Sequence, residues 1–92
     1  MSRIHLIVHG RVQGIFFRAS ALELARELGL SGWVRNRLNG SVELVAEGST
    51  EALGQFSAWC AKGPRGAVVR NVEVIDEAAT GEFNSFDVRG EA

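Results

Sequence analysis

Two segments of different hydrophobic periodicity meet at Gly10-Arg11-Val12-Gln13-Gly14-Ile15-Phe16-Phe17-Arg18. The preceding segment, residues 4–9, has apolar side chains on both faces and is predicted to be a central strand. The quoted stretch is therefore predicted to be a strand-to-helix loop. Because Gly10 and Gly14 can take positive φ without steric cost, the loop can turn its backbone N–H groups inward. We expect an anion to fit there.

The segment after the loop has the spacing of an amphipathic helix. Its apolar stripe consists of Phe17, Ala21, Leu24, Ala25 and Leu28. Gly29-Leu30 predicts a Schellman-type end with the glycine in the left-handed conformation. The start stays open between two positions, because Ser20-Ala-Leu-Glu23 matches a capping box whereas the stripe begins at Phe17. In either case Arg18 lies at the entrance of the helix.

Residues 33–38 and 41–47 are predicted to form a hairpin about Asn39-Gly40. A tight two-residue turn would mix polar and apolar side chains on each face. A one-residue bulge at Gly40 instead gives one buried face, made of Val34, Asn36, Val42, Leu44 and Ala46. We favour the bulged register, which leaves Arg35 and Glu43 on the outer face and Trp33 partly exposed.

A second helix and one long strand are predicted in the rest of the chain. Ser49 or Thr50 is expected to cap the helix, and Gly63-Pro64 to end it. Its inner stripe consists of Leu53, Phe56, Trp59 and Cys60. The remaining predictions are a strand at 67–77 with Val72 and Val74 against one face, a mobile loop at 78–84, a short strand at 86–88 and a frayed end at 90–92.

The order of the predicted elements is strand, helix, strand, strand, helix, strand, with a small extra strand at the end. This is the split βαβ or ferredoxin-like plan, an α+β sandwich with an antiparallel sheet of order 4-1-3-2 and both helices on one face. The first two strands then run parallel, each antiparallel to the strand between them. The loop after the first and the end of the second emerge at the same edge, about 10 Å apart. We therefore expect Arg18 and Asn36 to reach one pocket.

Composition limits the classes of function. A chain of 92 residues is predicted to be a single domain, 1–92, and its net charge of −1 gives no general attraction for nucleic acid. No apolar segment has the length of a membrane span or a signal peptide. The only cysteine, Cys60, cannot form an internal disulfide, so we expect a reducing, cytoplasmic compartment. We also expect a monomer. Cys60 is interpreted as a core residue, and His5 as too isolated for a metal site.

Further segments join the loop in a resemblance to the acylphosphatase family that covers nearly the whole chain. They are Gly32-Trp-Val-Arg-Asn36, Gly40-Ser-Val42-Glu43, and Gly63-Pro64 with Ala67 and Val69. The resemblance implies hydrolysis of carboxyl–phosphate anhydrides to a carboxylate and inorganic phosphate, with no metal, cofactor or phosphoenzyme. It also implies that Arg18 holds the phosphoryl group and that Asn36 positions the attacking water. The phosphate-binding loop would consist of Arg11, Val12, Gln13, Gly14, Ile15, Phe16 and Arg18.

The residue types in these motifs suit this chemistry. An acyl phosphate releases a carboxylate whose conjugate acid has a pKa of about 4, so no general acid is required. Backbone N–H groups and one guanidinium can stabilise phosphoryl transfer without a cation. Inorganic phosphate is expected as product and competitive ligand.

Two other classes of function stay open. One is a module that binds phosphate or carbamoyl phosphate without significant turnover. The other is an RNA-binding domain of the same fold, which the sequence disfavours because it lacks an exposed aromatic pair and a basic sheet face.

Overall fold

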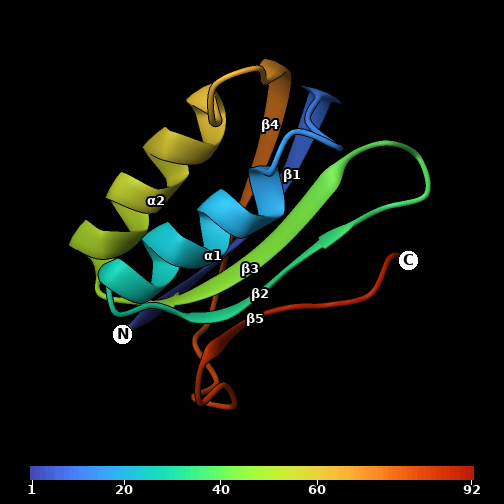
Figure 1. The fold of residues 1–92 in the computed structure, drawn as a ribbon. Coiled ribbons are helices and arrows are strands. Elements are labelled where there is room, and N and C mark those ends of the chain that lie inside the picture. The colour runs from blue at the N-terminus through green and yellow to red at the C-terminus, as the bar shows by residue number, and fades with distance from the viewer.

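The computed structural model describes residues 1–92 and contains two helices on one side of a five-stranded sheet (Figure 1). The strands are β1 (Ser2–Arg11), β2 (Ser31–Asn36), β3 (Val42–Gly48), β4 (Val68–Glu77) and β5 (Phe86–Val88). The helices are α1 (Phe17–Glu27) and α2 (Thr50–Lys62). This is the predicted α+β, ferredoxin-like arrangement. Neither helix has the length and apolar character needed to cross a membrane.

The strand order is β4-β1-β3-β2-β5, which confirms the predicted 4-1-3-2 order and adds the extra strand beside β2. The four long strands pair antiparallel, but β5 pairs parallel to β2. The sheet is therefore mixed and not antiparallel as predicted. The cause is the β4–β5 connection, which carries the chain from one edge of the sheet to the other before β5 begins (Figure 1).

The pairing of β1 with β4 fixes where the loop leaves the sheet. The register shifts by a bulge between His9 and Gly10, where Gly10 has a φ of 131°. A Cβ atom at Gly10 would lie 2.1 Å from the carbonyl oxygen of Val68, so only glycine allows this approach of the two backbones. Further along β4, Val72 packs against the core as predicted, but Val74 is half exposed because β4 is an edge strand.

α1 begins at Phe17, so the apolar stripe and not the capping box at residues 20–23 marks its start. Its N-cap residue, Phe16, has a φ of 62° and makes no side-chain capping bond. At the other end the backbone N–H of Leu30 donates to the carbonyl of Ala25, which confirms the predicted Schellman end.

The β2–β3 hairpin has the bulged register, in which Arg35 pairs with Glu43. Residues 37–41 form the connection, so β2 ends two residues earlier than predicted and β3 begins one residue later. Asn39 stabilises this connection because its side-chain oxygen accepts a hydrogen bond from the backbone N–H of Ser41 at 3.0 Å.

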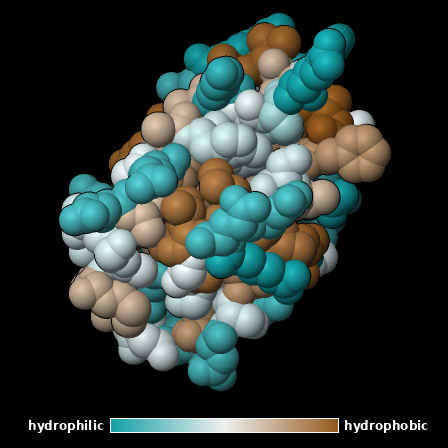
Figure 2. Space-filling view, turned by 60° about the vertical axis from the view of Figure 1, so that its left-hand side comes forward, coloured by the Kyte–Doolittle hydropathy of each residue, from teal (hydrophilic) through white to brown (hydrophobic).

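One core of buried apolar side chains fills the space between the sheet and the helices. Phe56 of α2 packs edge-on against Phe86 of β5 with ring centroids 5.7 Å apart, which ties the extra strand to the helix layer. Cys60 is fully buried, as predicted, and burial raises the pKa of its thiol. Ser49 caps α2, since its hydroxyl accepts from the N–H of Ala52 at 3.1 Å. On the helix side of the molecule, apolar surface gathers in the middle and hydrophilic side chains surround it (Figure 2).

The sheet face opposite the helices is less exposed than predicted. Trp33 is only 8% exposed, because the guanidinium groups of Arg35 and Arg89 lie over its ring at 4.9 and 4.8 Å from the centroid. Glu43 is on this outer face, as predicted, but is buried and accepts a hydrogen bond from Arg35 at 2.7 Å.

Residues 78–84, predicted to be a mobile loop, are held against the end of β3. The backbone N–H groups of Thr80 and Gly81 donate to the Glu47 carboxylate at 2.9 and 3.0 Å. Glu47 is 1% exposed, and these bonds hold the pKa of its carboxyl below the usual range. The loop is therefore anchored by a buried acidic side chain at the end of β3.

The C-terminal residues 90–92, predicted to fray, follow the edge of β2. The N–H of Ala92 donates to the carbonyl of Asn36 at 3.1 Å, and the carbonyl of Ala92 accepts from the N–H of Leu38 at 2.9 Å. The tail thus extends the pairing of β5 as far as the last residue of β2.

Candidate active site

The loop between β1 and α1 has a run of backbone N–H groups without acceptors in the chain. None of the N–H groups from Val12 to Ala19 donates to a backbone or side-chain atom, and the first hydrogen bond of α1 runs from Ser20 to Phe16. Gly14 and Phe16 have φ values of 75° and 62°, the left-handed conformation that lets neighbouring N–H groups converge. The helix N-terminus adds partial positive charge. Unpaired N–H groups, positive φ values and a helix N-terminus together are the geometry typical of an anion-binding loop.

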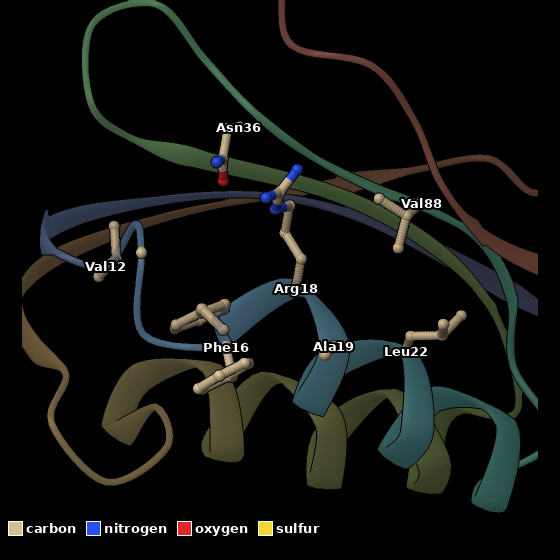
Figure 3. A pocket seen from close by; sticks show the side chains of 9 residues that line it. Val12, Phe16, Arg18, Ala19, Leu22, Asn36 and Val88 are labelled. Atoms are coloured by element: carbon tan, nitrogen blue, oxygen red, sulfur yellow. The ribbon is translucent and has the colours of Figure 1, made fainter.

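The loop borders a cavity of about 450 Å³. The cavity is lined by Val12, Gly14, Phe16, Phe17, Arg18, Ala19, Leu22, Asn36 and Val88. Its two polar side chains come from different elements, Arg18 from the first turn of α1 and Asn36 from the last residue of β2. Figure 3 shows the guanidinium of Arg18 extending from the helix toward the amide of Asn36. The predicted meeting of these two side chains in one pocket is therefore observed.

Arg18 is half-buried and takes part in none of the ion pairs of the molecule, which involve Arg3, Arg35 and the two histidines. Its planar fork of donors is suited to two oxygens of a phosphoryl group. The cavity thus contains one cationic group that no carboxylate neutralises.

Asn36 is 9% exposed, and its side-chain oxygen is buried without a hydrogen-bond partner. The backbone of Asn36 is fixed on both sides, by pairing with Val42 of β3 and by the hydrogen bond from Ala92. The amide is therefore held in place beside the cavity, and its oxygen accepts no hydrogen bond within the chain.

Gln13 connects the loop to the β2–β3 hairpin. Its side-chain Nε2 donates to the carbonyl oxygens of Arg37 and Ser41 at 2.8 and 2.9 Å. Both acceptors lie in the connection that follows Asn36. The side chain thus holds together the two segments that carry the loop and the amide.

The structure divides the predicted loop residues into two groups. Val12, Gly14, Phe16 and Arg18 line the cavity, whereas Arg11, Gln13 and Ile15 do not. Since the prediction assigned phosphate binding to backbone N–H groups, the absence of these three side chains from the cavity lining does not conflict with it. The run of unpaired N–H groups starts at Val12, directly after β1, and continues into the helix as far as Ala19.

Four apolar residues of the cavity were not predicted as site residues, namely Phe17, Ala19, Leu22 and Val88. Leu22 had a detectable signal, because it lies four residues after Arg18 and outside the core stripe, and residues at that spacing share a helix face. Val88 had none, since its place depends on the parallel pairing of β5 with β2.

The cavity contains no carboxylate, imidazole or thiol. The chain also has no group of three or more His, Cys, Asp or Glu side chains that could hold a metal ion. The arrangement can bind a tetrahedral oxyanion, stabilise negative charge and orient a water, but it has no proton donor for a basic leaving group. Fold and site together define a ferredoxin-like domain with a cavity suited to an anion.

Comparisons with known proteins name the family. Residues 4–88 match the acylphosphatase family model. An acylphosphatase of Methylococcus capsulatus is 53% identical over 88 residues, which are 96% of either chain. A crystal structure of an acylphosphatase from Bacillus subtilis has a TM-score of 0.92 and 34% identity, covering 97% of this chain and 99% of that one. The chain belongs to the acylphosphatase family, and its activity is the hydrolysis of acyl phosphates.

The same fold also occurs inside a larger protein. Full-length HypF in its phosphate- and nucleotide-bound form matches 98% of this chain with a TM-score of 0.89, but at 23% identity and over only 12% of its own length. This likeness concerns the fold alone.

Proposed function

We propose that the loop of residues 10–18 holds the phosphoryl group of the acyl phosphate, that Arg18 stabilises its charge and that Asn36 orients the attacking water. The observation that carries this proposal is the run of unpaired N–H groups from Val12 to Ala19 beside the cavity shared by Arg18 and Asn36.

In the proposed reaction the water oxygen attacks phosphorus and the bond from phosphorus to the acyl oxygen breaks. The acyl oxygen leaves as part of a carboxylate, and a phosphate oxygen of the substrate takes the proton from the water. The products are a carboxylate and inorganic phosphate. Because the transition state is loose, charge stabilisation and positioning supply most of the rate enhancement. Asn36 cannot act as a base, but its side-chain amide lines the cavity and can form a hydrogen bond with the water that directs the oxygen lone pair toward phosphorus.

Because the cavity contains no side chain that can protonate a leaving group, we expect it to act only on substrates whose leaving group is weakly basic. A carboxylate needs no protonation as it departs, whereas the alkoxide of an alkyl phosphomonoester does. Glycerol phosphate should therefore not be hydrolysed under conditions in which acetyl phosphate is.

The direct test is hydrolysis of acetyl phosphate in the presence of a chelator. We expect full activity of the unaltered chain, because Arg18 and the loop N–H groups supply the positive charge. Arg18→Gln and Asn36→Ala should each lower kcat/KM by roughly 10²–10³. Arg70→Gln, which removes an exposed arginine from the edge strand β4, is the matched control and should retain activity.

Full activity of both site variants would contradict the assignment of these residues. Loss of activity with the chelator would contradict metal independence. Phosphate binding without any turnover would point to a binding module instead.

We further propose that the chain acts as a single-domain monomer in the cytoplasm and that inorganic phosphate competes with the substrate. The loop that holds the phosphoryl group can hold free phosphate in the same way. Competitive inhibition by phosphate, and the mass of one chain by light scattering at assay concentration, are the expected results.

A further inference from the structure

We propose that the same cavity selects the acyl half of the substrate, and that it favours uncharged apolar acyl groups over acyl groups that end in a carboxylate. This proposal depends on the proposed function, since it concerns the part of the substrate beyond the phosphoryl group.

The polar and apolar parts of the cavity are separate. The polar side chains, Arg18 and Asn36, lie next to each other. Leu22 of α1 and Val88 of β5 lie across from one another in the cavity. Both are on one side of Arg18, and Val12 is on the other side (Figure 3). A phosphoryl group in the loop would therefore have apolar walls beside it, where the acyl group can extend.

The charge of the cavity disfavours a second anion. Arg18 is its one cationic side chain, and the phosphoryl group engages it. A carboxylate at the far end of the acyl group would lie beside the apolar surfaces of Leu22 and Val88, and the cavity lining has no further donor side chain to replace the part of its hydration that is lost there. It would also be repelled by the phosphoryl group nearby.

The two walls follow from the sequence and from the extra strand. Leu22 lies one helical turn after Arg18, so both side chains share a face of α1. Val88 is held against β2 by its pairing with Val34 and by the following hydrogen bond from the N–H of Arg89 to the carbonyl of Val34 at 2.9 Å. β5, which the four-stranded plan does not require, thus supplies one wall of the acyl site.

The first measurement compares three substrates with the unaltered chain: acetyl, butanoyl and succinyl phosphate. Each releases a carboxylate, but the second carboxylate of the succinyl group makes its leaving group more basic, so the change of the ratio between variants, in which this difference cancels, decides the assignment of the walls. Butanoyl adds two methylene groups to acetyl, and succinyl differs from butanoyl by a terminal carboxylate in place of a methyl group. We expect kcat/KM for butanoyl phosphate to exceed that for acetyl phosphate by about tenfold. A closed apolar pocket would give a larger ratio, but Val88 is 44% exposed and the cavity is open there. Succinyl phosphate should be about tenfold poorer than butanoyl phosphate.

The second measurement uses variants that should shift the selectivity toward the acyl group with a terminal carboxylate. Leu22→Lys places a cation on the apolar wall and should raise the ratio of kcat/KM for succinyl over butanoyl phosphate by about tenfold or more. Val88→Lys tests the opposite wall in the same way. Glu23→Gln is the matched control, since it makes the same change in net charge at an exposed position beside Leu22 and should leave the ratio unchanged. A ratio of two substrates does not depend on how much of a variant is folded.

Equal kcat/KM values for the three substrates, within about twofold, would overturn the selectivity while leaving hydrolysis itself intact. Ratios that stay constant in both lysine variants would overturn the assignment of the walls. No hydrolysis of any of the three substrates would overturn the proposed function, and this inference with it.

Discussion

Asn36 carries a buried amide oxygen that no group in the chain satisfies. An unpaired buried polar atom costs about 1–3 kcal/mol of folding free energy, so a chain optimised only for stability would place an apolar residue there. Arg18, close by, has no ion-pair partner either (Figure 3). Polar groups that are fixed in place and left unpaired beside a cavity are available to a ligand, at the expense of stability.

This trade-off can be measured by the same substitution at two positions of the hairpin. Asn36→Leu removes the unpaired oxygen, so the free energy of unfolding in urea should stay constant or rise by about 1 kcal/mol while acetyl phosphate hydrolysis is lost. Asn39→Leu removes an oxygen that accepts hydrogen bonds from the N–H and the hydroxyl of Ser41, at 3.0 and 2.6 Å. This substitution should lower the free energy of unfolding by about 1–2 kcal/mol. Equal destabilisation by both would show that the Asn36 amide is satisfied in solution.

The residues of the site differ in how far the sequence could predict them. The meeting of Arg18 and Asn36 in one cavity was predictable, because Arg18 follows one recognisable strand, Asn36 lies in another, and the strand order brings the two strand ends together. Leu22 could have been found from its spacing to Arg18. Val88 and the burial of Trp33 depend on contacts between segments far apart in the chain, which local patterns do not encode.

Among the elements, the loop and the β2–β3 hairpin form a unit through the side chain of Gln13. Its two hydrogen bonds, to Arg37 and Ser41, set the loop relative to the end of β2. Gln13 is therefore a positioning residue, since its side chain lies outside the cavity lining.

Loss of this link should move the loop away from Asn36. Gln13→Ala is expected to lower the free energy of unfolding by about 1–2 kcal/mol and to raise KM as well as lower kcat. Gln13→Glu should be worse than Gln13→Ala, because a carboxylate would face two carbonyl oxygens. Gln55→Ala, at an exposed position of α2, is the control. Steady-state kinetics with unaltered KM in both Gln13 variants would contradict the positioning role.

Element boundaries were predictable where a local signal was strong. The start of α1 at Phe17 agrees with the apolar stripe, and the register of the hairpin agrees with the requirement for one apolar face. The direction of β5 was not predictable, because it depends on the path of the β4–β5 connection around the sheet and not on the composition of 86–88.

Across the whole molecule, the outer sheet face is stabilised by buried acidic groups. Glu47 binds the backbone of the 78–84 loop, and Glu43 accepts from Arg35 and His5 at 2.7 Å each. Burial raises the pKa of the Glu43 carboxyl, but the hydrogen bonds from Arg35 and His5 outweigh it, so the pKa lies below its usual range. The sequence could not show this, since alternation along a strand tells which face a residue occupies but not what covers that face.

These acids make stability depend on pH in a defined direction. A carboxyl whose pKa is depressed in the folded state stabilises the fold fully above its unfolded pKa of about 4.3, and this stabilisation is lost as pH falls through the folded value. The free energy of unfolding should therefore decrease from about pH 5 to pH 3. Glu47→Gln should be less stable at neutral pH, because the new amide nitrogen would face a backbone N–H group that needs an acceptor. Its free energy of unfolding should also decrease less on acidification than that of the unaltered chain.

Glu27→Gln, at the exposed end of α1, should follow the unaltered chain over the same range. A Glu47→Gln curve parallel to that of the unaltered chain would exclude Glu47 as a source of the pH dependence.

The central claim is that water attacks the phosphorus atom of a phosphoryl group held by residues 10–18. Hydrolysis of acetyl phosphate in water enriched in oxygen-18 tests it directly, with the label located in the products by mass spectrometry. The proposed mechanism predicts one labelled oxygen in the inorganic phosphate and none in the acetate. Label in the acetate would show attack at the carbonyl carbon and would contradict the roles proposed for Arg18 and Asn36.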